Sequence, residues 1–251
     1  MISLNFIKII KFDFMNIIKN PMLLIVNTIF PFILIGVMGL VTSGSFGAGN
    51  VSSFDYNGIT MMIFVAFLIA MTASNTFMEE KVKRGNTRII YAPVSKVKIY
   101  LSKMISTYIL GSISYSFICF LGQFIFHINF GGKNLVYIML LINFAALFGT
   151  AFGIMCCCLL KSEEGANSVI PLVILVFVFF GGIFFPTVSF GRMVEMISVI
   201  SPVRWVTECA FQIIYDQNFH LFLPVMGMML LLSAICIAIC QITFKPEDYV
   251  A

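Results

Sequence analysis

The sequence predicts an all-α integral membrane protein with six transmembrane helices, an N-terminal amphipathic interfacial helix and a re-entrant helical segment before the last span. Three observations lead to this fold class: the composition, six long apolar runs and the placement of basic residues. Of 251 residues, 60% are hydrophobic and 10% are charged, whereas soluble domains are roughly 45 to 50% apolar and about 25% charged. So few charges cannot cover a soluble surface, and lipid must cover most of the chain.

Six runs are long enough to cross a bilayer. A helix rises about 1.5 Å per residue and needs about 20 apolar residues to span the hydrocarbon core. The runs lack the alternation of polar and apolar residues that a membrane β-barrel requires. We expect spans over residues 21–42, 57–78, 99–126, 135–160, 165–185 and 220–244.

Basic residues fall almost entirely on one side of these spans. If the N-terminus is cytoplasmic, all but three of the fifteen Lys and Arg lie on the cytoplasmic side, and the exceptions are Lys133, Arg192 and Arg204. Cytoplasmic loops retain basic residues, so both termini are expected in the cytoplasm. The net charge of +4 is spread between the apolar runs and forms no basic face, so no nucleic-acid partner is expected.

Residues 1–251 are expected to form a single transmembrane domain that begins with an interfacial helix over residues 1–20. Leu4, Ile7, Phe14 and Ile18 recur there at near-helical spacing, with lysines on other faces. This pattern is typical of an amphipathic helix on the inner membrane surface. A frayed basic tail that only fixes topology is the alternative.

Two further segments are too long for simple turns. Residues 79–98 form a cytoplasmic loop, and residues 186–219 form an external stretch rich in apolar side chains. We expect the external stretch to dip back into the membrane or pack on the bundle. Ser201 and Pro202 divide it into two helical pieces, because Ser is a good helix cap and Pro fits a first helical turn.

Small residues recur in the fourth predicted span. Ala145, Gly149 and Gly153 follow one another at four-residue spacing, which lets another helix approach closely. We expect that partner to be a helix of the same subunit, with dimerisation as the alternative.

No motif for catalysis, metal binding or nucleotide binding occurs in the sequence. It contains two His and no HExxH, no GxxxxGK[ST] phosphate loop and no CxxC among its seven Cys. The acidic residues fall outside the span centres, where an ion-coupled transporter would usually carry them. The chain is therefore not expected to be an enzyme, and uphill transport would draw its energy from a partner.

Three short motifs carry a family resemblance. The motifs are Glu79-Glu80 with Arg84-Gly85 before Pro93-Val94-Ser95-Lys96, then Phe180-Gly181-Gly182-Ile183-Phe184-Phe185-Pro186, then Ile200-Ser201-Pro202-Val203-Arg204-Trp205. In order and spacing they resemble the integral-membrane subunits of ABC-2 type transporters, and within that family the drug and peptide efflux members most closely.

This resemblance implies the permease subunit of an ATP-binding cassette exporter in a bacterial plasma membrane. Such a subunit would move a hydrophobic or amphipathic drug, peptide or lipid-like substrate out of the cell. Its partners would be two copies of a cytoplasmic ABC ATPase, a second permease and membrane lipid. ATP and Mg would be bound by the ATPase, and no cofactor by this chain. Two alternatives remain: export of lipid-linked polysaccharide, and an ion-coupled secondary transporter or channel.

The same resemblance assigns ATPase coupling to the loop after the second span. There, Glu79 and Glu80 would hold the loop by polar contacts, Gly85 would form its turn, and Arg84 and Arg88 would face the ATPase. A solvated loop that only sets topology is the alternative.

Polar residues near the last external segment suggest a second site. Arg204, Glu208, Gln212 and Asp216 repeat every four residues and would form one stripe of a helix, with an Arg204 to Glu208 pair. The stripe is interpreted either as an external gate formed by Arg204 and Glu208 or as a helix face exposed to external water.

Overall fold

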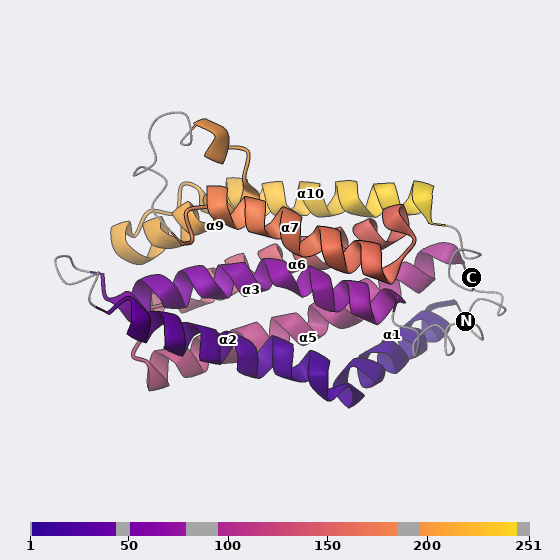
Figure 1. The fold of residues 1–251 in the computed structure, drawn as a ribbon, viewed down its shortest axis with the longest axis horizontal. Coiled ribbons are helices and arrows are strands. Elements are labelled where there is room, and N and C mark those ends of the chain that lie inside the picture. The colour runs from indigo at the N-terminus through magenta and orange to yellow at the C-terminus, as the bar shows by residue number, and fades with distance from the viewer. Residues whose placement is uncertain (1, 44–50, 79–94, 185–195, 245–251) are drawn as a thin grey trace.

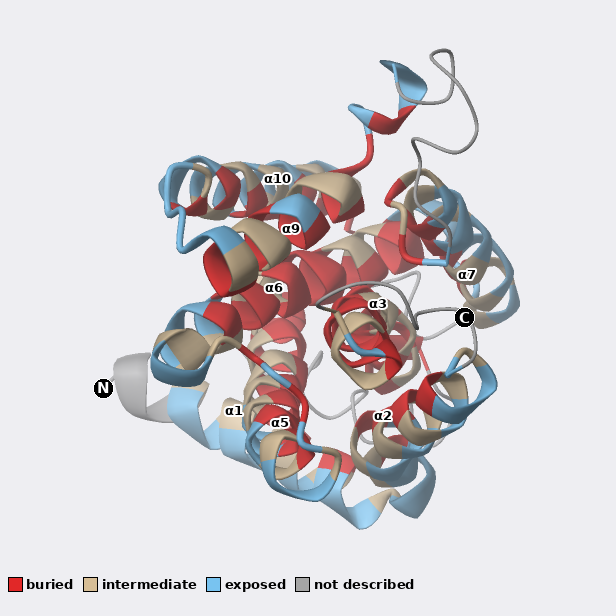
Figure 2. Cartoon of the chain, turned by 90° about the vertical axis from the view of Figure 1, so that its left-hand side faces the viewer, coloured by how far each residue is buried: buried red, intermediate tan, exposed pale blue. Residues whose placement is uncertain are grey.

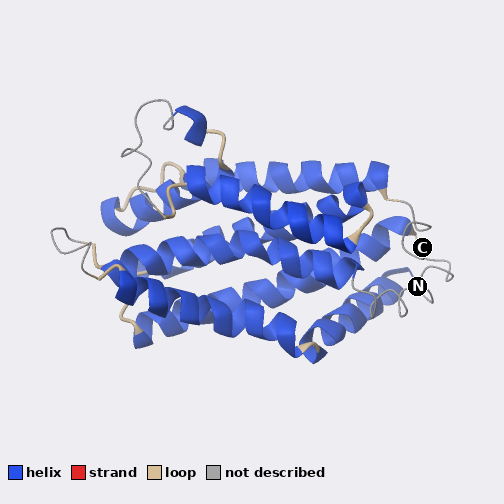
Figure 3. Cartoon of the chain, in the orientation of Figure 1, coloured by secondary structure: helices blue, strands red, loops and turns tan. Residues whose placement is uncertain are grey.

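Every regular element in the described part of the chain is helical (Figure 3). The computed structural model describes residues 2–43, 51–78, 95–184 and 196–244, and side chains from Phe6 onward in the first helix. Its main helices are α1 (Ile2–Lys19), α2 (Pro21–Val41), α3 (Ser53–Met78), α5 (Lys96–Ile125), α6 (Leu135–Leu160), α7 (Glu163–Phe180), α9 (Pro202–Phe211) and α10 (Phe222–Thr243). A 3-10 turn, η1 (Gly132–Asn134), precedes α6, and a π-helical turn, η3 (Gln212–Asp216), follows α9.

Six of these helices are long and apolar enough to cross a membrane, and they confirm the six predicted spans. These helices are α2, α3, α5, α6 with its preceding turn, α7 and α10. They run side by side along the long axis of the molecule (Figure 1). α1 lies at one end of this bundle, together with the start of α5 and the last turn of α10. We call this end the α1 end and the other the opposite end. The chain is therefore a multi-pass membrane protein.

Local capping chemistry sets several helix boundaries. The Asn20 side chain accepts a hydrogen bond from the Met22 amide, and Pro21 occupies the first turn, so α2 begins directly after α1. At the start of α3, Ser52 Oγ accepts from the Asp55 amide at 3.0 Å while Asp55 Oδ2 accepts from the Ser52 amide at 3.3 Å. This reciprocal capping box starts α3 four residues before the predicted span.

α3 is the central helix of the bundle (Figure 2). In its most apolar stretch 78% of residues are buried, against 22% in the corresponding stretches of α2, α7 and α10. It packs most closely on α6, where an added Cβ at Gly153 would lie 2.2 Å from the Ala70 carbonyl oxygen and one at Gly149 would lie 2.8 Å from that of Ala66. The small residues of α6 therefore serve packing within the subunit, as predicted.

α9 lies against the bundle at the opposite end. Val203, Val206, Cys209, Ala210 and Ile213 are almost completely buried. Pro202 occupies the first turn of α9, but the Ser201 hydroxyl donates to the Phe177 carbonyl at 2.6 Å and does not cap the helix. The part of the external segment that forms α9 thus packs on the spans, residues 186–195 lie outside the described residues, and re-entry of the segment into the membrane stays a prediction.

Candidate functional site

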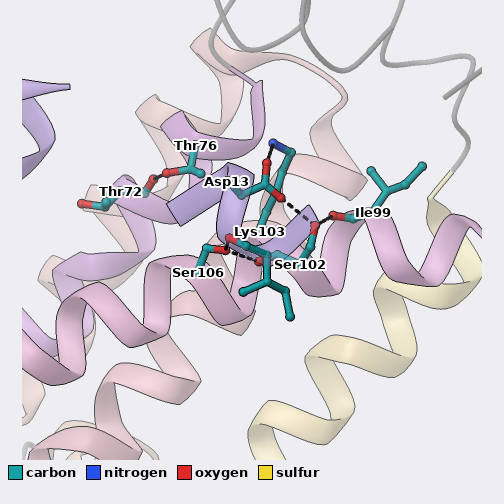
Figure 4. A network of polar contacts seen from close by, with 8 residues as sticks. Asp13, Thr72, Thr76, Ile99, Ser102, Lys103 and Ser106 are labelled. Carbon is teal, nitrogen blue, oxygen red and sulfur yellow. Dashed lines mark hydrogen bonds and ion pairs between the residues drawn. The ribbon is translucent and has the colours of Figure 1, made fainter. Parts of the chain in front are cut away.

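A buried ion pair joins α1 to α5 at the α1 end (Figure 4). Lys103 Nζ lies 3.2 Å from Asp13 Oδ1, and each side chain is only 2% exposed. The second carboxylate oxygen, Oδ2, accepts a hydrogen bond from Ser102 Oγ at 2.7 Å. Both oxygens of Asp13 therefore have a partner, as a charged group shielded from water requires.

Two more contacts hold α1 in place. Ser106 Oγ, one turn further along α5, donates to the Ile10 carbonyl at 2.9 Å. Ile17 of α1 is buried with Leu23 of α2 and Leu110 of α5 in a small apolar cluster separate from the main core. α1 is thus fixed to the spans by an ion pair, two hydroxyls and an apolar contact, and the α1–α5 link below means Asp13, Ser102, Lys103 and Ser106.

The α1–α5 link lies close in sequence to the predicted coupling loop. Lys103 begins the third turn of α5, and α5 starts at Lys96, two residues after the stretch 79–94. The predicted coupling residues Glu79, Glu80, Arg84, Gly85 and Arg88 lie outside the described residues, so their roles stay predictions. Within α5, about two helical turns separate Lys96 from Lys103.

Halfway along the bundle, a polar cluster ties α2 to α3 and α5. Asn27 Nδ2 donates to Thr72 Oγ1 at 2.9 Å and to the Leu23 carbonyl at 2.7 Å. Tyr115 Oη lies 3.0 Å from Asn27 Oδ1 and 3.2 Å from the Val65 carbonyl oxygen, and can donate to either. α2 buries little of its apolar surface. These hydrogen bonds therefore supply much of the specific attachment of the half of α2 that lies nearer to α1.

A second polar cluster attaches α2 to α3 at the opposite end. Ser53 Oγ donates to the Gly39 carbonyl at 2.7 Å and lies 2.6 Å from Thr42 Oγ1. Asn57 Nδ2 donates to Thr42 Oγ1 at 2.7 Å. α2 is therefore tied to α3 by polar groups at two levels and remains apolar on its outer side.

One face of α3 remains partly uncovered between α2 and α7. Both helices pack on α3, on either side of this face (Figure 2). From Asn57 to the end of α3 every residue is buried except Phe64, Leu68, Met71 and Asn75, whose spacing places them on one side of the helix. We call these four residues the α3 stripe.

An amide pair lies at the end of the stripe nearest to α1. Asn167 Nδ2, in the second turn of α7, donates to Asn75 Oδ1 at 3.0 Å. The buried Asn167 Oδ1 has no hydrogen-bond partner among the described residues. The α3 stripe is therefore apolar at Phe64, Leu68 and Met71 and becomes polar at Asn75, which contacts α7.

At the opposite end, Arg204 and Glu208 form the predicted pair. Arg204 Nε lies 3.8 Å from Glu208 Oε2, with the side chains 22% and 43% exposed, and the guanidinium also donates to Ser198 Oγ. The predicted four-residue stripe is interrupted, because α9 ends at Phe211 and the chain continues as a π-helical turn from Gln212. The geometry supports a surface pair, and its role as a gate stays a prediction.

Tyr215 belongs to the same end of the molecule. Burial and the nearby Asp55 carboxylate raise the pKa of Tyr215 to about 12. Its phenol is therefore protonated at neutral pH. Its neutral ring stacks on Phe211 of α9, with 6.0 Å between the ring centroids.

The α1–α5 link was not predicted from the sequence. Lys103 was counted among the basic residues that set topology, and Asp13 among the acidic residues outside the span centres. A signal was present: Lys103 is a lone charge inside an apolar run, and Asp13 is the sole acidic residue before the first span. A charge inside an apolar span is costly and calls for a partner.

Comparison with known families identifies a family for this chain. A family model described as "ABC-2 family transporter protein" matches residues 47–240, which covers most of the chain from before α3 into the last turns of α10. A search among curated proteins gave no match.

Proposed function

Because this chain belongs to the ABC-2 transporter family, we propose that it is the permease subunit of an exporter driven by a separate ATPase. The observation that carries the proposal is the family match over residues 47–240. ABC-2 members are membrane transporter domains and not catalytic ones. The proposed substrate is hydrophobic or amphipathic, such as a drug, a peptide or a lipid-like molecule, and the proposed direction is outward across a bacterial plasma membrane.

The proposed path runs along the α3 stripe. A second permease, identical or similar to this one, would cover the outer faces of α2 and α7 and enclose the stripe between the two subunits. The low burial of α2 and α7 supports this, since both leave large apolar faces without a partner in the described chain. Phe64, Leu68 and Met71 would contact apolar parts of the substrate, because they are partly exposed between these helices.

The proposed energy source is ATP hydrolysed with Mg by two copies of a cytoplasmic ATPase. Their movement would enter through the loop that carries Glu80, Arg84 and Gly85, and the α1–α5 link would pass it from α5 to α1. The buried pair supports such rigid transmission, because separating two charges inside the protein is strongly unfavourable. Arg204 and Glu208 would open and close the external end of the path.

The proposal is tested by isolating the tagged chain in mild detergent with its bound proteins. We expect a P-loop ATPase in stoichiometric amount, with vanadate-sensitive ATP hydrolysis after reconstitution. Replacing Glu80, Arg84 and Gly85 together should release the ATPase, whereas the matched change Lys133→Gln in the η1 turn should leave it bound. Isolation of the chain without any ATPase, with transport on an ion gradient, would favour a secondary transporter.

A further inference from the structure

The outward side of α1 carries all three of its lysines. Lys8, Lys11 and Lys19 are exposed. They share this side with the exposed apolar residues Ile7, Phe12, Met15 and Ile18. We call these seven residues the cationic face of α1.

The sole carboxylate of α1 is turned away from this face. Asp13 points to α5, is 2% exposed and is neutralised by Lys103. Among the described residues, no carboxylate forms an ion pair with Lys8, Lys11 or Lys19. The cationic face therefore presents three positive charges without a neutralising partner in the described chain.

The depth of α1 is set by its connection to α2. Only Asn20 separates Lys19 from Pro21, the first residue of a membrane span. The hydrogen bond from Met22 to the Asn20 side chain and the burial of Ile17 against Leu23 fix this junction. The C-terminal end of α1 must therefore lie where the hydrocarbon core meets the headgroups.

We propose that the cationic face of α1 binds anionic phospholipid headgroups of the leaflet in which α2 begins. Lipid phosphates match the three lysines in charge, and the adjacent acyl region accepts Ile7, Phe12, Met15 and Ile18 at the same depth. A hydrophilic protein surface would satisfy the lysines and leave these apolar side chains in water. α1 precedes the family-matched residues 47–240, and lipid binding by its cationic face can be measured without an ATPase or a substrate, so its failure would leave the proposed transport function untouched.

The proposal is tested by placing a fluorescent probe on α1 in the full chain. Trp205 is the sole tryptophan, so Trp205→Phe combined with Phe12→Trp gives a reporter on the cationic face. The protein is reconstituted with brominated phosphatidylglycerol or brominated phosphatidylcholine at equal mole fraction, and quenching is compared. Each lysine near a headgroup is expected to raise local anionic-lipid occupancy by about fivefold, so quenching by the anionic lipid should be clearly stronger.

Controls separate charge recognition from simple proximity to lipid. The preference should disappear in Lys8→Gln/Lys11→Gln/Lys19→Gln and persist in Lys133→Gln, a lysine of the η1 turn. It should also weaken in the parent protein at high salt, because added ions screen exposed charges. Equal quenching by the two lipids, or a preference that survives the triple change, would overturn the proposal. So would the absence of quenching, which would place α1 against protein or water. The test needs neither ATPase nor substrate.

Discussion

The two ends of the bundle each carry an ion pair in the described part of the chain, in opposite surroundings. At the α1 end, Asp13 and Lys103 are each 2% exposed and join two helices. At the opposite end, Arg204 and Glu208 are 22% and 43% exposed and belong to the same helix, α9. The first pair connects parts of the chain ninety residues apart, whereas the second connects consecutive turns.

This difference in burial sets what each pair contributes. An exposed pair is screened by water and salt and contributes about 0 to 1 kcal/mol. Removing one member of a buried pair leaves a charge without solvent or partner and costs about 3 to 5 kcal/mol. The α1 end is therefore held in one arrangement, while the Arg204–Glu208 contact can form and break at little cost. The proposed transmission at one end and the proposed gate at the other would require this difference between a rigid connection and a weak contact.

The largest expected effect comes from breaking the buried pair on one side. Lys103→Met alone leaves the buried Asp13 carboxylate without its cation, with only the Ser102 hydroxyl as a partner among the described residues, and should lower the free energy of unfolding by about 3 to 5 kcal/mol. Thermal unfolding in detergent, followed by circular dichroism, measures the change.

The matched control is the double change Asp13→Asn/Lys103→Met. An amide at position 13 still accepts from Ser102, and no charge remains buried, so most of the lost stability should return. If the double variant were as unstable as the sum of the two single variants, the charges would not be coupled and the contrast between the two ends would fail.

An intermediate effect is expected for the uncharged polar cluster. Tyr115→Phe removes the donor to Asn27 or Val65 and leaves a buried acceptor without its partner, which costs about 1 to 3 kcal/mol. The control is Tyr137→Phe at an exposed phenol of α6, where a smaller change is expected. Equal shifts in melting temperature would show that the cluster does not hold α2.

The smallest effect is expected at the exposed pair. Glu208→Gln keeps the Arg204 contact with Ser198 and removes one partly exposed charge, so stability should fall by less than about 1 kcal/mol. The difference from the unchanged protein should vanish at high salt. A loss as large as that of Lys103→Met would mean that the two pairs are energetically alike.

The positions of the spans could be predicted closely because the length and apolarity of a run are properties of the local sequence. Run length and apolarity gave six helices, and the predicted fourth span has the bounds of α6, Leu135–Leu160. Boundaries shifted where caps and glycines decide them: α3 starts at its capping box, and α7 ends at Phe180, before Gly182 with φ of 72°. Such end effects depend on a few side chains and not on average hydropathy.

Tertiary contacts were harder to predict. Asp13 and Lys103 each read as an ordinary charged residue near a span, and their pairing depends on how α1 folds back on α5. The Arg204–Glu208 contact was predictable because it follows from helical spacing alone. The uncovered face of α3 could not be predicted either, since polar residues such as Asn57 and Thr72 lie on its buried sides and the packing of neighbouring helices decides which side stays open.

The most direct test of the proposed function is the energy source of transport in proteoliposomes. One preparation holds the chain alone, and the other holds the chain with its copurified ATPase. We expect uptake of a hydrophobic dye only in the second preparation, only with ATP and Mg, and with inhibition by vanadate. Transport by the isolated chain on a proton or sodium gradient, unaffected by vanadate, would contradict the account.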